Sequence, residues 1–175
     1  DGTIATRAIQ NFVVEDLSNW YIRRNRRRFW SSENDTSKLA VYKVTYDILV
    51  GVCKLVAPIA PFASEEIYTK LTGEESVHLT DYPVFDEKLI NEKIENRMDL
   101  VRDLISLGRN IREEVKIKVR QPLSEALIDA KNEDLISDLT ELVKEELNVK
   151  DVKFIKEVEN YMNFTVKPNF KEVGK

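Results

Sequence analysis

The spacing of apolar residues changes once along this chain, and that change limits the folds that the chain can adopt. Up to Val115, apolar residues recur every three or four positions, which is the period of one face of a helix. After Val115 they alternate with polar residues, which is the period of a strand. The sequence therefore predicts a mainly α fold, in which a helical bundle is followed by a small α+β module.

Three long helices and one short helix are predicted for the first part. We place them at residues 4–30, 36–56, 61–71 and 86–114. The helix over 36–56 is apolar on both sides, so we expect it to be central. The sequence APIAP ends it, because proline removes a backbone donor and clashes with the preceding turn. We expect the short helix to direct four side chains inward: Phe62, Ile67, Tyr68 and Leu71.

Strands are predicted in the second part. The first covers residues 115–119, where apolar and basic residues alternate until Pro122 ends the run. Further strands are expected at 124–130, 149–155 and 161–168, with a helix over 132–147. We place the domain boundary within the last long helix. The bundle then covers residues 1–112, and the α+β module covers residues 113–175.

Composition narrows the classes of protein to consider. Apolar residues make up 42% and charged residues 33%, as in water-soluble globular proteins. No apolar run approaches the ~18 residues of a membrane helix, and the first residues do not resemble an export signal. We therefore expect a cytoplasmic protein without a membrane partner. With one cysteine and one histidine, a metal site is not expected.

Five arginines are concentrated between Trp20 and Trp30. This segment contains no acidic residue and carries +5, so the rest of a chain of net charge −4 carries −9. A helix turns by ~100° per residue, so the five cannot share one face. We expect two of them to pack inward, Arg24 and Arg28. The other three then point outward, where guanidinium groups can bind phosphate: Arg23, Arg26 and Arg27.

Charge alone leaves two interpretations of this cluster open. One is a solvent-exposed face with salt bridges, and the other is an RNA-binding surface. The neighbouring aromatic residues favour RNA, because single-stranded bases stack on aromatic rings beside arginines. The spacing of Trp20 favours a core position, whereas Trp30 at the helix end is a candidate for stacking.

A second basic group follows the last long helix. Lys116, Lys118 and Arg120 alternate along the predicted strand, and Arg112 lies one helical turn earlier. These residues are a second candidate RNA surface. The alternative is an ordinary exposed strand, in which lysines protect an edge from pairing with other chains.

Four segments together resemble a known family. The run DLSNWYIRRNRRRFW at 16–30 is similar to the segment that opens the anticodon-binding domain of isoleucyl-tRNA synthetases. Three more matching segments follow in that family's order: 40–71, 76–83 (SVHLTDYP) and 116–123 (KIKVRQPL). The resemblance covers residues 6–130, and the remaining tail matches only in the order of its elements.

This resemblance implies a part in the ATP-dependent joining of isoleucine to its tRNA, in which this chain binds the anticodon stem and loop of tRNA(Ile). It gives an RNA-binding role to four arginines as a group: Arg23, Arg26, Arg27 and Arg28. ATP and magnesium are implied for the full-length enzyme, with no cofactor in this part. No HIGH-like or KMSKS-like signature is present, so we expect catalysis to need the catalytic and editing domains as partners.

Two other assignments stay open from the sequence. The chain could be the equivalent domain of a valyl- or leucyl-type synthetase, since these enzymes share a bundle of this kind. It could also be a helical protein-interaction module that uses its Trp/Arg end as a docking surface.

Overall fold

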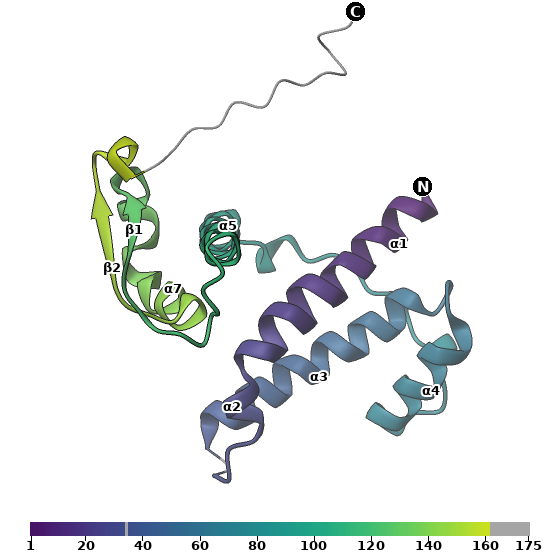
Figure 1. The fold of residues 1–175 in the computed structure, drawn as a ribbon. Coiled ribbons are helices and arrows are strands. Elements are labelled where there is room, and N and C mark those ends of the chain that lie inside the picture. The colour runs from purple at the N-terminus through teal and green to yellow at the C-terminus, as the bar shows by residue number, and fades with distance from the viewer. Residues whose placement is uncertain (34, 162–175) are drawn as a thin grey trace, which may run out of the picture. The chain divides into compact units, whose positions relative to one another are not determined.

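The computed structural model describes residues 1–33 and 35–161 of the chain (Figure 1). The described part is mainly helical and has a two-stranded parallel sheet near its C-terminal end, which confirms the predicted fold class. It forms two compact units, of which the first covers Asp1–Asp86 and the second begins at Glu87. In the described residues, no helix is long and apolar enough to cross a membrane.

A nearly continuous helical run opens the first unit, in agreement with the helix predicted at 4–30. It consists of α1 (Gly2–Asn11), η1 (Phe12–Ile22) and α2 (Arg26–Phe29). Within η1 the hydrogen bonding is π-helical, which widens the turn. The run is interrupted at Asn25, whose side-chain amide donates to the Tyr21 carbonyl at 2.8 Å.

Helix α3 (Thr36–Val56) has the predicted bounds and runs back beside the first helical run (Figure 1). It begins at Asp35, whose carboxylate accepts a hydrogen bond from the Lys38 backbone N–H at 2.7 Å. Helix α4 (Pro61–Thr72) begins with proline at its first position and ends at Gly73, which has φ of 72°. Local signals thus set the bounds of both helices.

The core of the first unit lies where α3 and α4 meet the short helix η2 (Val77–Leu79). It contains Cys53, Ala57, Tyr68 and Val77. The Tyr68 hydroxyl donates to the Glu74 carboxylate, and this bond is the main cause that raises the pKa of Tyr68.

Some side chains expected in the core are exposed instead. Tyr68 is buried as predicted, but Phe62 is 90% exposed and Ile67 is 48% exposed. A short helix at the edge of a unit buries only a narrow face, which in α4 consists of Ser64 and Tyr68. Of α3, predicted to be central, only Val41 and Cys53 are buried. The apolar stripes of α3 and α4 therefore contain more residues than the core of the first unit buries.

The second unit has a long helix and a strand–helix–strand arrangement. Its elements, in order, are η3 (Glu87–Leu89), α5 (Glu92–Glu114), β1 (Leu123–Asp129), η4 (Ala130–Asn132), α6 (Glu133–Ile136), η5 (Ser137–Leu139), α7 (Thr140–Leu147), β2 (Val149–Ile155) and η6 (Val158–Tyr161). The two strands pair in parallel, with Leu123 opposite Val149 and Asp129 opposite Ile155. Both agree with the strands predicted at 124–130 and 149–155. The strand predicted at 161–168 lies outside the described residues apart from Tyr161.

The helix predicted at 132–147 is broken near its middle. Arg97 of α5 donates through Nε to the Leu135 carbonyl at 2.6 Å and pairs with the Asp138 carboxylate. This ion pair also lowers the pKa of Asp138. At this point the chain forms α6, η5 and α7 in place of one helix.

The strand predicted at 115–119 is wrong, because residues 115–122 form turns and irregular structure, with no strand among them. Helix α5 ends with Lys116 in the left-handed region at φ of 58°. The Ile117 N–H then bonds to the Arg112 carbonyl at 2.8 Å, and the Lys116 N–H bonds to the Glu113 carbonyl at 3.0 Å. This pattern is a Schellman motif, which satisfies the last carbonyls of the helix without a strand.

A buried arginine holds these turns in place. The side chain of Arg112 is 3% exposed, and its guanidinium donates to four carbonyl oxygens, those of Lys118, Gln121, Leu147 and Asn148. The shortest of these bonds, to Leu147, is 2.6 Å. Arg112 was expected to contact RNA. Because its donors face protein carbonyls away from solvent, it has a structural role instead.

The compact units divide before α5, whereas the sequence places the boundary inside that helix, between residues 112 and 113. Helix α5 packs closely on α7: a Cβ added to Gly108 would lie 2.6 Å from Leu147 Cδ1. This close approach groups α5 with the elements that follow it. The assignment of 1–112 and 113–175 as separate domains stays a prediction.

Replacement of Arg112 by methionine tests its structural role. We expect Arg112→Met to lower the free energy of unfolding by about 2–4 kcal/mol, because it leaves carbonyls buried without donors. Urea unfolding followed by circular dichroism measures this change. Arg120→Met is the matched control, because Arg120 is exposed in the same turn region. An equal effect of the two substitutions would contradict the assignment.

Cys53 reports on the core of the first unit. Burial raises the pKa of its thiol, so the reactive thiolate is disfavoured in the folded chain. We expect iodoacetamide at pH 8 to modify Cys53 at least about tenfold more slowly in the folded chain than in urea. Mass spectrometry over time measures the two rates. Equal rates would show that the core opens freely.

Candidate nucleic-acid interface

The arginine-rich segment divides into inward and outward side chains, as the helical turn predicts. Arg23, Arg26 and Arg27 are exposed, whereas Arg24 and Arg28 are half-buried. Because the helix breaks at Asn25, the last three arginines belong to the short helix α2. The exposed cations therefore lie at the end of the first helical run, where α3 begins.

Arg28 connects the two helices of this end. Its Nε donates to Ser37 Oγ at 2.8 Å, and its Nη2 donates to the Ser37 carbonyl at 2.6 Å. Its Nη1 donates to Asn25 Oδ1 at 2.7 Å. All three nitrogens of the guanidinium thus bond within the protein. Arg28 fixes α2 against the first turn of α3, and we remove it from the candidate RNA contacts.

Two further arginines contact the preceding turn. The Arg24 guanidinium lies 5.2 Å from the ring centre of Trp20, which is itself half-buried. Trp20 is thus partly covered, but it is not one of the buried core residues that its spacing predicted it to join. Arg23 donates through Nε to the Asn19 carbonyl at 2.8 Å, while its side chain stays exposed.

Trp30 and Arg26 form the most exposed aromatic–cation pair of this end. The indole of Trp30 is 71% exposed, and the Arg26 guanidinium lies 4.7 Å from its ring centre. Cation–π attraction of this kind is worth ~0.5–1 kcal/mol at an exposed site, enough to bias the orientation of both groups. An exposed indole is thus held in place without being covered.

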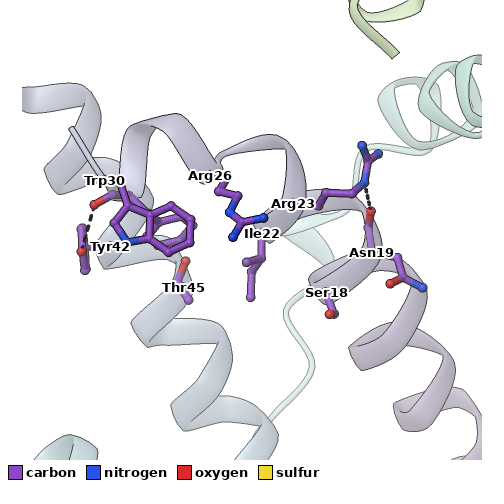
Figure 2. Close-up of a pocket in the computed structure, with 9 residues that line it drawn as sticks. Ser18, Asn19, Ile22, Arg23, Arg26, Trp30, Tyr42 and Thr45 are labelled. Atoms are coloured by element: carbon purple, nitrogen blue, oxygen red, sulfur yellow. Dashed lines mark hydrogen bonds between the residues drawn. The ribbon is translucent and has the colours of Figure 1, made fainter. Parts of the chain in front are cut away.

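A hollow of about 590 Å³ lies beside this pair (Figure 2). It is lined by Ser18, Asn19, Ile22, Arg23, Arg26, Phe29, Trp30, Tyr42 and Thr45. One wall is formed by Phe29 and Tyr42, whose rings meet edge to face with centres 5.3 Å apart. The Tyr42 hydroxyl also donates to the Phe29 carbonyl at 3.2 Å. The hollow combines aromatic walls with a cationic rim.

Arg27 differs from the other four arginines. It is exposed, and its side chain makes no hydrogen bond, ion pair or contact with an aromatic ring among the residues that the structure describes, whereas Arg26 contacts the ring of Trp30. A guanidinium in this state can bind a phosphate without first breaking a protein contact.

The second basic group lies in the other compact unit. Lys116, Lys118 and Arg120 are exposed in the turns after α5, and their side chains make no ion pair within the described residues. Arg112, predicted to join them, is buried beneath the same turns. The structure therefore places three of the four predicted cations at the surface.

Several lining residues were not predicted from the sequence. One signal could have found part of the set: Ser18, Ile22, Arg26 and Trp30 are spaced four residues apart, which puts them on one side of a helix. No comparable signal exists for Tyr42 and Thr45, because α3 brings them to the hollow only when it folds back.

Among residues 1–33 and 35–161, no three or more His, Cys, Asp or Glu side chains are placed to bind a metal ion.

Comparison with known proteins identifies the family. Residues 3–128 match the model of the family described as the anticodon-binding domain of tRNA ligase. The chain belongs to this family. The arginine-rich segment and the hollow beside Trp30 both lie within the residues that match this family.

Similar curated proteins are isoleucine–tRNA ligases. The chain is 43% identical over 175 residues to that of Chlamydia trachomatis serovar L2, a match that covers 96% of this chain and 17% of that protein. It is 44% identical over 182 residues to that of Cytophaga hutchinsonii, and this match covers 99% of this chain and 16% of that protein. It is 42% identical over 179 residues to that of Clostridium novyi, and this match covers 99% of this chain and 17% of that protein. The chain thus spans about 17% of the length of the relatives that it matches.

The inward arginine of the anticodon-binding domain can be tested by its effect on stability. We expect Arg28→Met to lower the free energy of unfolding by about 1–2 kcal/mol, because two hydrogen bonds from α2 to Ser37 of α3 and one to Asn25 are lost. Arg27→Met is the matched control and should leave stability unchanged. Urea unfolding compares the two, and a larger effect at Arg27 would contradict the division into inward and outward arginines.

Proposed function

We propose that this anticodon-binding domain binds the anticodon stem and loop of tRNA(Ile), as part of an isoleucine–tRNA ligase. The observation that carries the proposal is the exposed group of Arg26, Arg27 and Trp30 at one end of a chain of this family. The choice of tRNA(Ile) is supported by the names of the similar proteins.

The chemistry of this end suits a single-stranded RNA loop. Arg23, Arg26 and Arg27 offer guanidinium groups to phosphate oxygens, and exposed Trp30 offers a ring on which a base can stack. The rest of the chain carries −9, so the +5 of this segment is the strongest local attraction for a polyanion.

Lys116, Lys118 and Arg120 complete the proposed RNA-binding set. They are exposed and lie in the turns that Arg112 holds. We leave Arg112 and Arg28 out of this proposed set, because protein oxygens accept hydrogen bonds from most of their N–H donors.

The chemistry of aminoacylation belongs to other parts of the proposed full-length ligase. We propose that ATP and magnesium bind there, in the cytoplasm, and that catalytic and editing domains pack on this chain. The support for such packing is the exposure of large apolar side chains on α4 and after it. These are Phe62 at 90%, Leu79 at 72%, Val84 at 91% and Phe85 at 71% exposure. Apolar surface of this extent is typical of a protein contact.

Arg27 gives the sharpest test of RNA binding. We expect Arg27→Ala to weaken binding of tRNA(Ile) about fivefold, and to reduce the slope of log affinity against log salt by about 0.7–0.9, because one phosphate contact is lost. Filter binding at several salt concentrations measures both. Lys43→Ala is the matched control, since Lys43 is an exposed helical cation already paired with Asp47.

A tRNA with an altered anticodon completes this experiment. It should bind more weakly than tRNA(Ile) at every salt concentration. Equal binding of both tRNAs would contradict the anticodon-binding role, and an unchanged salt slope in Arg27→Ala would contradict the role of Arg27.

A further inference from the structure

A small notch lies in the first unit, where the end of α3 meets η2 and the residues that follow it. Its volume is about 190 Å³, below the ~300–1,000 Å³ of pockets that bind small ligands. Ala57, Pro58, Val77 and the ring of Tyr82 form its apolar walls. The Tyr82 hydroxyl donates to the Leu55 carbonyl at 3.4 Å, which holds this ring at the end of α3. A cavity of this size suits one inserted side chain of a protein partner better than a small molecule.

Asp81 supplies the charge of the notch. Its side chain is exposed and makes no hydrogen bond or ion pair with the residues that the structure describes. The end of α3 adds to this charge, because the carbonyl end of a helix is partially negative. Lys54 also lines the notch, but its ammonium lies 5.9 Å from the ring centre of Tyr68 and is not paired with Asp81. The carboxylate therefore remains available to a cation from outside the unit.

Exposed apolar side chains adjoin the notch along the chain. Ile59 follows Pro58 and is 50% exposed, and Leu79 lies between two residues that line the notch and is 72% exposed. Tyr82 itself is 57% exposed. A charged centre bordered by apolar side chains is typical of a contact between proteins. A nucleic-acid surface, in contrast, is basic.

Arginine fits this notch better than lysine. Its guanidinium is planar and weakly hydrated, so it can stack on the Tyr82 ring while it donates bidentately to the Asp81 carboxylate. The lysine ammonium is compact and strongly hydrated, so it loses more hydration when it leaves water. Arginine is also among the residues that contribute most to binding at protein interfaces.

The source of such an arginine follows from the length of the relatives. The chain spans about 17% of their length, so most of a ligase of that length lies outside it. We propose that an arginine from this remaining part of the ligase inserts into the notch and pairs with Asp81. The exposed apolar side chains beside the notch then pack on the surface that carries the arginine. This inference rests on the proposed function, because it requires the chain to be part of a full-length ligase.

Carboxyl footprinting of the full-length protein tests the pairing. A carbodiimide with glycine ethyl ester converts accessible carboxylates to amides, and mass spectrometry gives the rate at each residue. We expect Asp81 to react at least about tenfold more slowly than Glu75, because charge-assisted hydrogen bonds hold the Asp81 carboxylate. Glu75 is the internal control, since it is exposed in the same unit and its side chain has no partner among the described residues.

A photo-crosslinker finds the arginine. When p-benzoylphenylalanine replaces exposed Leu79, it should crosslink within the same chain, to a segment of the ligase beyond these 175 residues. Each arginine of that segment is then changed to glutamine. One such variant should raise the rate at Asp81 to that at Glu75, whereas lysine at the same position should keep part of the protection, because the charge is retained. Asp81→Asn should lower the crosslink yield at least about threefold, because it leaves the arginine buried without a partner charge. Glu75→Gln should not change the yield.

Any of three results would overturn this inference. If Asp81 reacts as fast as Glu75, or if no crosslink forms within the chain, no other part of the ligase covers the notch. If Asp81 reacts slowly but no arginine of the crosslinked segment changes its rate, the cover is apolar alone. If the crosslink joins two copies of the chain, the occupant is a second copy.

Binding of tRNA(Ile) distinguishes this inference from the RNA-binding role. A ligase that protects Asp81 through an arginine but does not bind tRNA(Ile) would overturn the RNA-binding role and leave the notch as proposed. A ligase that binds tRNA(Ile) in an Arg27-dependent way but leaves Asp81 reactive would overturn only the occupant of the notch.

Discussion

The turn of a helix, about 100° per residue, governs the arginine-rich end of this chain. Five arginines in six positions cannot face solvent together, so some must find partners inside the protein. Arg28 does so through Ser37 and Asn25, and this contact fixes α2 against the start of α3. Because Arg28 points inward, Arg26 and Arg27 point outward. The proposed RNA surface thus depends on an arginine that we exclude from it.

Arg112 performs a comparable task in the second unit. Its guanidinium collects four carbonyl groups from the turns after α5 and from the end of α7. A planar group with five donors suits this role better than lysine, whose charge is compact and strongly hydrated. The exposed cations Lys118 and Arg120 are carried by the turns that Arg112 stabilises. In both units, a buried or half-buried arginine positions the cations that can reach RNA.

The sequence predicted regular elements well where local signals agreed. Apolar periodicity gave α3 its correct bounds, and the strand predicted at 149–155 has the bounds of β2. The alternation of apolar and basic residues at 115–119 predicted a strand that does not form. There the Schellman motif around Lys116 ends the helix, and Arg112 takes up the carbonyls that a strand would have paired. Alternating apolar and polar residues show that a segment could form a strand with two different faces. The strand forms only where another strand is available for backbone hydrogen bonds.

In the candidate site, too, some features follow from the sequence and others only from the tertiary structure. By itself the sequence predicted that Arg23, Arg26 and Arg27 point outward and that Trp30 lies at the helix end, because the turn of a helix spreads neighbouring residues around its axis. Only the tertiary structure decided that Tyr42 of α3 closes the hollow beside them. It also decided that Arg28 and Arg112 turn inward. Their partners at Ser37 and Leu147 lie 9 and 35 residues away, and packing alone brings such distant groups together.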